Sequence, residues 1–146
     1  MELNFSIRLR SFSASLAALE DAETLLWPEN PDACRFIWSG ILAKFCITFD
    51  LAWKLTRDVL AHHHKRTDFI AGSPKKVLEA AFQTEMIEDD AWVDMLQLRN
   101  EIAHEYKDDE TVQKWGERVI GDFIPLFRKL RDYVDGISAE AGGSHG

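Results

Sequence analysis

Four side chains with useful chemistry lie close together in the stretch "LQLRNEIAHEY", residues 96–106. Arg99 can bind a phosphate, His104 can exchange a proton near neutral pH, and Tyr106 carries a phenol. Asn100 and His104 are four residues apart and share one helix face. His104 follows Arg99 by five residues, about 140° round an ideal helix. One phosphate can therefore touch both only if the helix ends or distorts there, or if a second subunit contributes. On spacing alone, a structural histidine remains the alternative.

The arginine lies where an apolar residue is expected. The stretch has helical spacings of 4, 3, 4 and 3, and the residues at these positions are Trp92, Leu96, Arg99, Ala103 and Tyr106. An isolated buried charge is very costly, so Arg99 needs a partner or a water-filled recess. Asp50 interrupts the apolar run "FCITFDLAWK" and is the obvious candidate. Whether Asp50 pairs with Arg99 or faces solvent stays open at this stage.

Helical periodicity dominates the chain, and no strand-like alternation of any length is present. We expect a second helix with two apolar stripes to be buried at the centre of the fold, with Asp32 as its N-cap. Gly121 and Pro125 predict a kink in the last helix. The expected helices cover residues 4–26, 32–62, 74–84 after Ser73, a fourth that begins at "IEDDAW", and 110–137.

These elements predict an all-α fold, an antiparallel four-helix up-and-down bundle with one additional short helix. Residues 1–137 form a single domain in this interpretation, and residues 138–146 form a disordered tail.

Composition narrows the possible partners. The net charge is −8, from 17 basic and 25 acidic residues, so a general nucleic-acid surface is not expected, DNA is not a predicted partner, and any RNA contact must be local. No apolar run approaches the roughly 20 residues that span a membrane. Cys34 and Cys46 lie in one predicted helix, about 18 Å apart, so they cannot bridge each other. We expect a cytoplasmic protein that does not bind a membrane.

Two further clusters have ordinary explanations. Adjacent residues of a helix point about 100° apart, so the run His62 to His64 is a poor metal site, and cations are favoured at a helix C-terminus. Four of the five tryptophans fall on apolar stripes and are predicted core residues: Trp38, Trp53, Trp92 and Trp115. Trp27 precedes a proline in a loop and is the freer one.

Three segments in series resemble the HEPN superfamily, in the branch that is paired with minimal nucleotidyltransferases. The motif of this branch is an arginine, four residues, a histidine, one residue and a tyrosine. Arg99, His104 and Tyr106 match it. The resemblance extends over most of residues 36–110, where three segments match characteristic segments of the branch in order. They are "FDLAWKLTRDVL", "GSPKKVLEAAF" and "WVDMLQLRNEIAHEY", the last of which contains the motif. Members of this branch have been called nucleotidyltransferase substrate-binding proteins, and relatives are toxins of two-gene toxin–antitoxin modules.

The resemblance implies an all-α homodimer that brings two copies of the motif to one cleft. It implies a metal-independent endoribonuclease in which Arg99 stabilises the scissile phosphate of RNA and His104 is the general acid or base. Asn100 would position the phosphate or His104, and Asp50 would hold Arg99. No cofactor or metal is implied in this chain.

In related pairs the partner nucleotidyltransferase transfers an adenylyl group from ATP to the tyrosine of the motif. The resemblance therefore implies that adenylylation of Tyr106 silences a toxin, with ATP and magnesium bound by the partner. The alternative function is a non-catalytic substrate-binding subunit of a two-protein nucleotidyltransferase.

Overall fold

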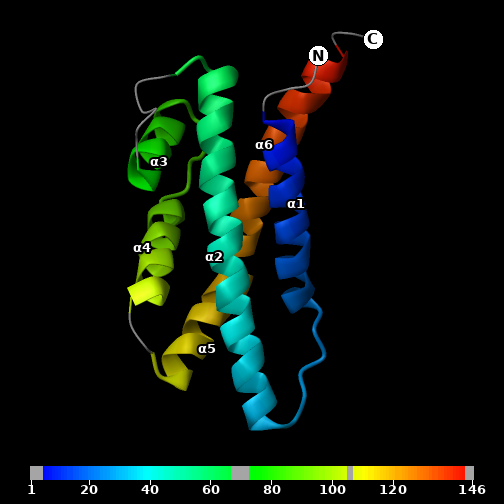
Figure 1. Cartoon of the computed structure of the whole chain (residues 1–146), viewed down its shortest axis with the longest axis vertical. Coiled ribbons are helices and arrows are strands. Elements are labelled where there is room, and N and C mark those ends of the chain that lie inside the picture. The colour runs from blue at the N-terminus through cyan, green and yellow to red at the C-terminus, as the bar shows by residue number, and fades with distance from the viewer. Residues whose placement is uncertain (1–4, 67–72, 105–106, 144–146) are drawn as a thin grey trace.

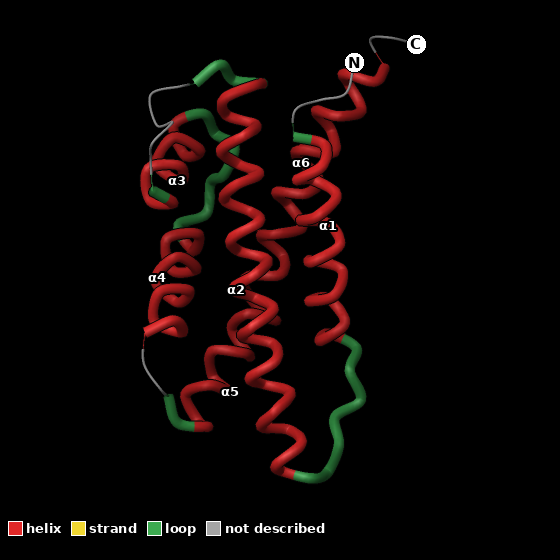
Figure 2. Tube along the Cα trace, viewed as in Figure 1, coloured by secondary structure: helices red, strands yellow, loops and turns green. Residues whose placement is uncertain are grey.

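The chain folds into a bundle of antiparallel helices. The computed structural model describes residues 5–66, 73–104 and 107–143, and every regular element within these ranges is helical (Figures 1 and 2). The long helices alternate in direction, because α1 and α4 run down the view of Figure 1 while α2 and α6 run up. The predicted all-α, up-and-down bundle is confirmed. The helices are α1 (Ser6–Glu20), α2 (Pro31–His62), α3 (Pro74–Gln83), α4 (Ala91–His104), α5 (Asp109–Arg118) and α6 (Ile124–Gly143).

Helix α2 lies at the centre, as its two apolar stripes predict. It packs against α1, α3, α4, α5 and α6. Its Phe45 is fully buried, with its ring centre 5.5 Å from that of Phe123, just before α6, and 6.1 Å from that of Phe127 in α6. Phe12 of α1 meets Phe127 of α6 edge to face at 5.9 Å. These interlocked aromatic rings join α1, α2 and α6 through one hydrophobic core.

The first helix is shorter than its periodicity predicts. Helix α1 ends at Glu20, a 3₁₀ turn covers Asp21–Glu23, and the chain is irregular up to α2. Leu26, the last residue of the predicted first helix, is 92% exposed. The cap of α2 also differs, because the side chain of Asn30 accepts hydrogen bonds from the backbone N–H groups of Asp32 and Ala33. Asp32 instead lies in the first turn.

The expected irregularity in the last helix takes the form of a π-helical turn. Residues Val119–Phe123 lie between α5 and α6, and the backbone N–H of Ile124 donates to the carbonyl of Val119, five residues earlier. Pro125 has no N–H for the carbonyl of Gly121, so a wider turn relieves both the missing bond and the steric clash. Helix α6 continues to Gly143, so the tail predicted to be disordered from residue 138 is helical as far as that residue.

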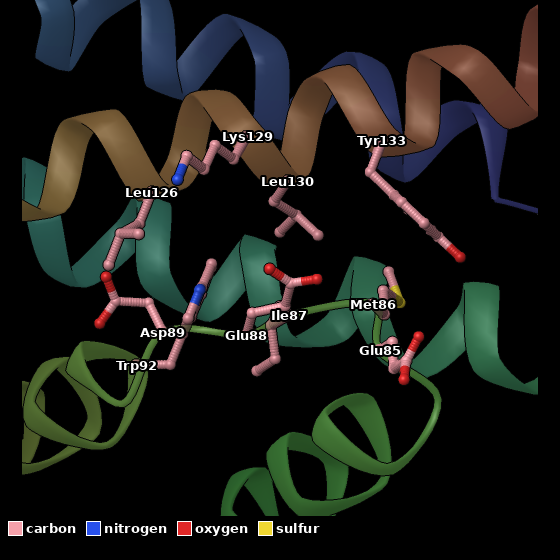
Figure 3. Close-up of a pocket in the computed structure, with 10 residues that line it drawn as sticks. All are labelled: Glu85, Met86, Ile87, Glu88, Asp89, Trp92, Leu126, Lys129, Leu130 and Tyr133. Carbon is pink, nitrogen blue, oxygen red and sulfur yellow. The ribbon is translucent and has the colours of Figure 1, made fainter.

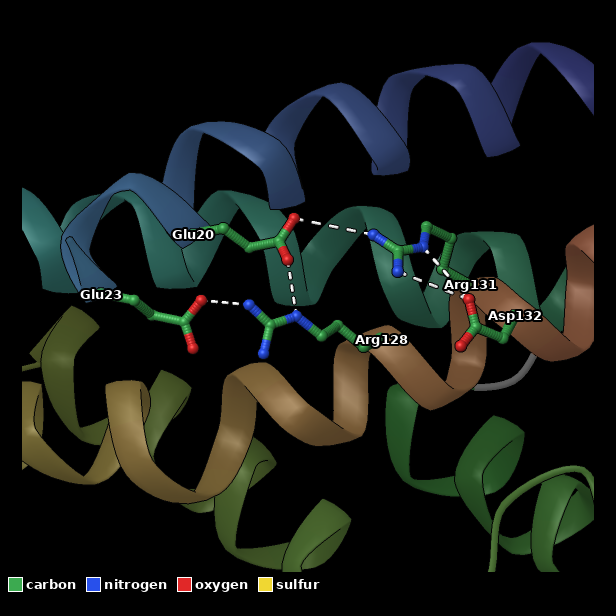
Figure 4. Close-up of polar contacts among 5 residues, drawn as sticks. All are labelled: Glu20, Glu23, Arg128, Arg131 and Asp132. Carbon is green, nitrogen blue, oxygen red and sulfur yellow. Dashed lines mark hydrogen bonds and ion pairs between the residues drawn. The ribbon is translucent and has the colours of Figure 1, made fainter.

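Ion pairs join α1 to α6 on the surface (Figure 4). Arg128 donates from Nε to Glu20 at 2.6 Å and from Nη2 to Glu23. Arg131 approaches the other oxygen of Glu20 at 3.6 Å and also binds Asp132, its neighbour. Because these side chains form a network, they hold the two helices in register more firmly than one isolated surface pair would.

One face of α2 is apolar and uncovered in the monomer. Phe36 is 77% exposed and Ile47 is 57% exposed, with the exposed Gly40 and Ala43 between them at spacings of 4, 3 and 4. Helix α2 is also long and apolar enough to cross a membrane, with 33% of its most apolar window buried. The central helix of a bundle meets the same criteria, so this result assigns no membrane. The exposed Phe36 and Ile47 leave apolar surface of α2 in contact with water.

Candidate functional site

The buried face of α4 differs from the predicted one. Met95 and Leu98 are buried together with Trp92, and Ile102 packs partly against the core. Ala103, predicted to face inward, is exposed. The inward stripe is therefore rotated by about one residue from the predicted stripe. Arg99 lies at its edge rather than at its centre, which is why a charged residue is tolerated there.

Arg99 is held by Asp50 of α2. Its Nε donates to Oδ1 of Asp50 at 3.1 Å and its Nη2 donates to Oδ2 at 3.0 Å. The Arg99 side chain is 29% exposed and that of Asp50 is 36% exposed. This two-pronged geometry fixes the plane of the guanidinium and leaves Nη1 uncommitted to Asp50. Hydrogen bonding to Asp50 raises the pKa of Arg99, so the group keeps its charge. The pairing that the sequence left open is thus present.

A thiol lies next to this ion pair. Cys46 is four residues before Asp50, on the same side of α2, and is partly buried. Burial raises the pKa of Cys46, and the nearby Asp50 adds to this effect while Arg99 opposes it. A protonated, partly buried thiol is a poor nucleophile. Cys46 therefore lies near the ion pair without obvious chemistry, and no pattern in the sequence pointed to this position.

The other motif residues lie at the end of α4. Asn100 and His104 are both exposed, and His104 is the last residue of the helix. Among the described residues, neither forms a hydrogen bond with Arg99 or Asp50. Tyr106 lies outside the described residues. One chain thus presents Arg99 and His104 on different sides of α4, as their separation of about 140° requires.

A shallow apolar groove lies beside the end of α4. Its volume is about 270 Å³, and it lies between α2, α4 and α5. Its lining residues are Ser39, Leu42, Ala43, Ile102, Lys107, Val112 and Trp115. The ammonium group of Lys107 lies 5.7 Å from the ring centre of Trp115. Two of its lining residues, Ile102 and Lys107, lie two residues before and three residues after His104 in the sequence.

A larger cavity lies away from the motif. Its volume is about 410 Å³, and it lies between the α3–α4 connection, the start of α4, and α6 (Figure 3). Glu85, Glu88 and Asp89 lie around its mouth, with Lys129 opposite. None of the motif residues lines it. Its carboxylates would repel a phosphate, so it does not suit an anionic substrate.

The clustered histidines have a structural contact. Nε2 of His64 lies 2.8 Å from the hydroxyl of Tyr133, which joins the end of α2 to α6. Burial lowers the pKa of His64, and the neighbouring His63 lowers it further. The described residues include no group of three potential metal-ligating side chains placed to hold an ion. His64 is thus explained by packing.

The tryptophans differ in how deeply they are buried. Trp92 is 2% exposed and belongs to the core, as predicted. Trp38, Trp53 and Trp115 only pack against the core and remain partly accessible. Trp27 is 37% exposed and its ring centre lies 4.5 Å from that of Trp38. Three of the four predicted core tryptophans therefore keep accessible surface.

A family model described as "nucleotidyltransferase substrate binding protein like" matches residues 7–135. The chain belongs to this nucleotidyltransferase substrate-binding, HEPN-like family. The match runs from α1 into α6 and therefore includes Asp50, Arg99 and His104. Comparison with curated proteins gives no match. Membership of the substrate-binding family associates the chain with a nucleotidyltransferase partner, as its name implies.

Proposed function

We propose that this chain is a HEPN-type toxin, a metal-independent endoribonuclease that acts as a homodimer and is silenced by a nucleotidyltransferase partner. The observation that carries the proposal is the Arg99–Asp50 pair. A guanidinium that is oriented by a carboxylate, yet keeps a free edge and 29% exposure, is suited to receive a phosphate. No metal is needed to bind the phosphate in this arrangement.

A second copy would complete the site. Arg99 and His104 point in different directions from one helix. Within a single chain, one phosphate can therefore contact Arg99 or His104 but not both. The apolar face of α2, from Phe36 to Ile47, supports a dimer because it leaves large apolar side chains in water. Dimerisation through this face would bring the ends of the two α4 helices towards one cleft.

The proposed reaction is cleavage of an RNA phosphodiester. The 2′-hydroxyl of the ribose attacks the adjacent phosphorus, and the bond from phosphorus to the leaving 5′ oxygen breaks. His104 removes the proton of the hydroxyl or protonates the leaving oxygen, and Arg99 stabilises the charge on the phosphate in the transition state. Asn100, exposed one residue after Arg99, would donate to the phosphate or orient His104.

The proposed silencing acts on Tyr106, which follows His104 by two residues in the sequence. The partner would transfer an adenylyl group from ATP to this phenol, using its own magnesium. The added nucleotide brings bulk and negative charge to the place where the RNA phosphate must bind. RNA would then be excluded both sterically and electrostatically.

A non-catalytic substrate-binding subunit is the second candidate. The description of the family itself favours it. The exposed Glu101 next to Asn100 also adds negative charge where RNA would approach. In this function the same surface presents a substrate to the nucleotidyltransferase and His104 has no catalytic part.

Expression of the chain alone in a bacterial host tests the proposal. We expect growth arrest with the unaltered chain and normal growth with His104→Ala at equal levels of folded protein. Normal growth in both cases, with the dimer present in the lysate, would favour the binding subunit.

The silencing step has its own control. Tyr106→Phe should arrest growth like the unaltered chain but should resist rescue by the partner nucleotidyltransferase. Intact-mass measurement after incubation with partner, ATP and magnesium should show one added AMP on the unaltered chain and none on Tyr106→Phe. Rescue of Tyr106→Phe would place the modification, or the silencing, elsewhere.

A further inference from the structure

The charge of this acidic chain is unevenly distributed. Residues 51–78 contain six Lys or Arg residues and two Asp or Glu residues, whereas the other 118 residues contain 11 and 23. The helical parts of this segment are residues 51–62 of α2 and residues 74–78 of α3, and Figure 1 shows α3 beside that half of α2. A protein with a net charge of −8 thus carries a local cationic region that can attract an anionic polymer.

Trp53 lies at the beginning of this region with two cations on its ring. Nζ of Lys54 lies 5.9 Å from the ring centre and the guanidinium carbon of Arg57 lies 5.5 Å from it. The indole packs partly against the core, which fixes its position, and keeps accessible surface. An aromatic ring flanked by cations is the combination that proteins use to bind single-stranded nucleic acid, because bases stack on the ring and phosphates meet the charges.

These three residues continue from the Arg99–Asp50 pair. Trp53, Lys54 and Arg57 follow Asp50 by three, four and seven residues, so all lie within about 60° of its direction round α2. A rise of about 1.5 Å per residue places Trp53 about 5 Å, and Arg57 about 10 Å, beyond Asp50 along the helix. The side chains therefore form a row that leads from the phosphate-binding arginine into the cationic region.

The carboxylate nearest to this row is already engaged. Asp58 approaches Nε of Arg57 at 3.3 Å, but its other oxygen accepts a hydrogen bond from Arg8 of α1 at 2.5 Å. Arg8 balances the charge of Asp58, so Arg57 is not neutralised by a carboxylate of its own. The row keeps a net positive charge.

We propose that Trp53, Lys54 and Arg57 bind the RNA strand on one side of the scissile phosphate. One base stacks on Trp53, and Lys54 and Arg57 contact the following phosphates, while Arg99 binds the phosphate that reacts. This assignment rests on the proposed function, because RNA as the ligand comes from there. It explains how an acidic protein selects RNA through one local surface.

Binding of a fluorescein-labelled, single-stranded oligoribonucleotide tests the assignment. The protein is the full chain with His104→Ala, which keeps the RNA intact, and anisotropy is followed across a salt series. We expect Lys54→Gln with Arg57→Gln to weaken binding and to make the slope of log affinity against log salt shallower by about 0.7 for each lost phosphate contact. Trp53→Leu should weaken binding by roughly tenfold or more, whereas Trp53→Phe should keep most of it.

The control carries the same loss of charge elsewhere. Lys44→Gln with Lys129→Gln removes two exposed ammonium groups, one from α2 outside the row and one from the rim of the acidic cavity. This double variant should bind RNA almost as the parent does, with the same salt slope. Equal weakening by both double variants would mean that only net charge matters and would overturn the assignment.

Other outcomes distinguish failure of the RNA-binding row from failure of the proposed function. No RNA binding by the folded parent would contradict the proposed function itself. Binding that Arg99→Ala weakens, but that changes at Trp53, Lys54 and Arg57 leave intact, would overturn the row alone. Equal losses in Trp53→Leu and Trp53→Phe, with matching losses in thermal stability, would assign Trp53 to packing and overturn its stacking contact.

Discussion

The bond between Arg99 and Asp50 should make a measurable but modest contribution to stability. In a fully buried setting, hydrogen bonds to charged groups contribute about 1.5–3 kcal/mol each. Here the two side chains are 29% and 36% exposed, so solvent screens the pair towards the range of about 0.2–1 kcal/mol that exposed pairs show. The paired geometry, at 3.0 and 3.1 Å, favours the upper end of that range. We therefore expect a coupling free energy of about 1 kcal/mol at low salt.

A double-mutant cycle measures this coupling. The unaltered chain, Asp50→Ala, Arg99→Ala and the double variant are unfolded in urea, and the free energies of unfolding are compared. Arg99→Lys with Asp50 intact is a useful fifth protein, because it keeps the charge but cannot bridge both carboxylate oxygens, so part of the coupling should be lost. In about 1 M salt the Debye length falls to about 3 Å and the coupling should shrink.

Two outcomes of the cycle would contradict the expected coupling. A coupling free energy near zero would mean that Asp50 does not hold Arg99 in solution, and the argument that the guanidinium is oriented for phosphate would fail. A coupling of several kcal/mol, insensitive to salt, would mean that the pair is far more buried than the monomer shows. That second result would indicate that a dimer covers it.

Two further predictions concern packing and pH. A Cβ at Gly116 would lie 2.3 Å from Cε3 of Trp38, so Gly116→Ala should destabilise the chain by about 1–3 kcal/mol in urea unfolding. The Cβ of Gly136→Ala meets open space in α6, so this variant should raise the free energy of unfolding by about 0.5–1 kcal/mol. Changes of the same sign in Gly116→Ala and Gly136→Ala would contradict this contrast. The pKa of His64 is lowered on folding, so the unfolded chain binds more protons and stability should fall as pH drops below the usual value of 6.5. His64→Gln should flatten the pH dependence of the melting temperature in that range, and an unchanged slope would assign it to other groups.

The sequence predicted the elements of the fold better than their ends. Apolar spacing locates α2 within one residue at its start, because a helix that is buried on several sides repeats its pattern many times. The same spacing extends the first helix to Leu26, although the structure ends α1 at Glu20. Periodicity alone does not contain the hydrogen bonds that begin or end a helix. Asn30, followed by Pro31 at the first helical position, is a local capping signal, and the prediction of Asp32 as the cap overlooked it.

The site was harder to predict than the fold for a geometric reason. The prediction treated Arg99 as an inward residue. This shifted the predicted apolar stripe of α4 by about one position, so the buried Met95 and Leu98 were left out of the predicted core. A long arginine can reach a partner from the edge of a buried face, so it follows apolar spacing without belonging to the core. Arg99 and Asp50 are 49 residues apart in sequence, and their pairing depends on how α2 and α4 are rotated against each other. No local sequence pattern determines this rotation of α2 against α4.

Cleavage of RNA without metal is the most direct test of the proposed ribonuclease activity. The purified chain would be incubated with a single-stranded oligoribonucleotide in excess EDTA, beside His104→Ala of equal purity and equal melting temperature. The account predicts cleavage by the unaltered chain, with products that end in a 2′,3′-cyclic phosphate and a 5′-hydroxyl, and at least a hundredfold slower cleavage by His104→Ala. Equal rates for the two proteins, or no cleavage by a folded dimer that binds the RNA, would contradict it.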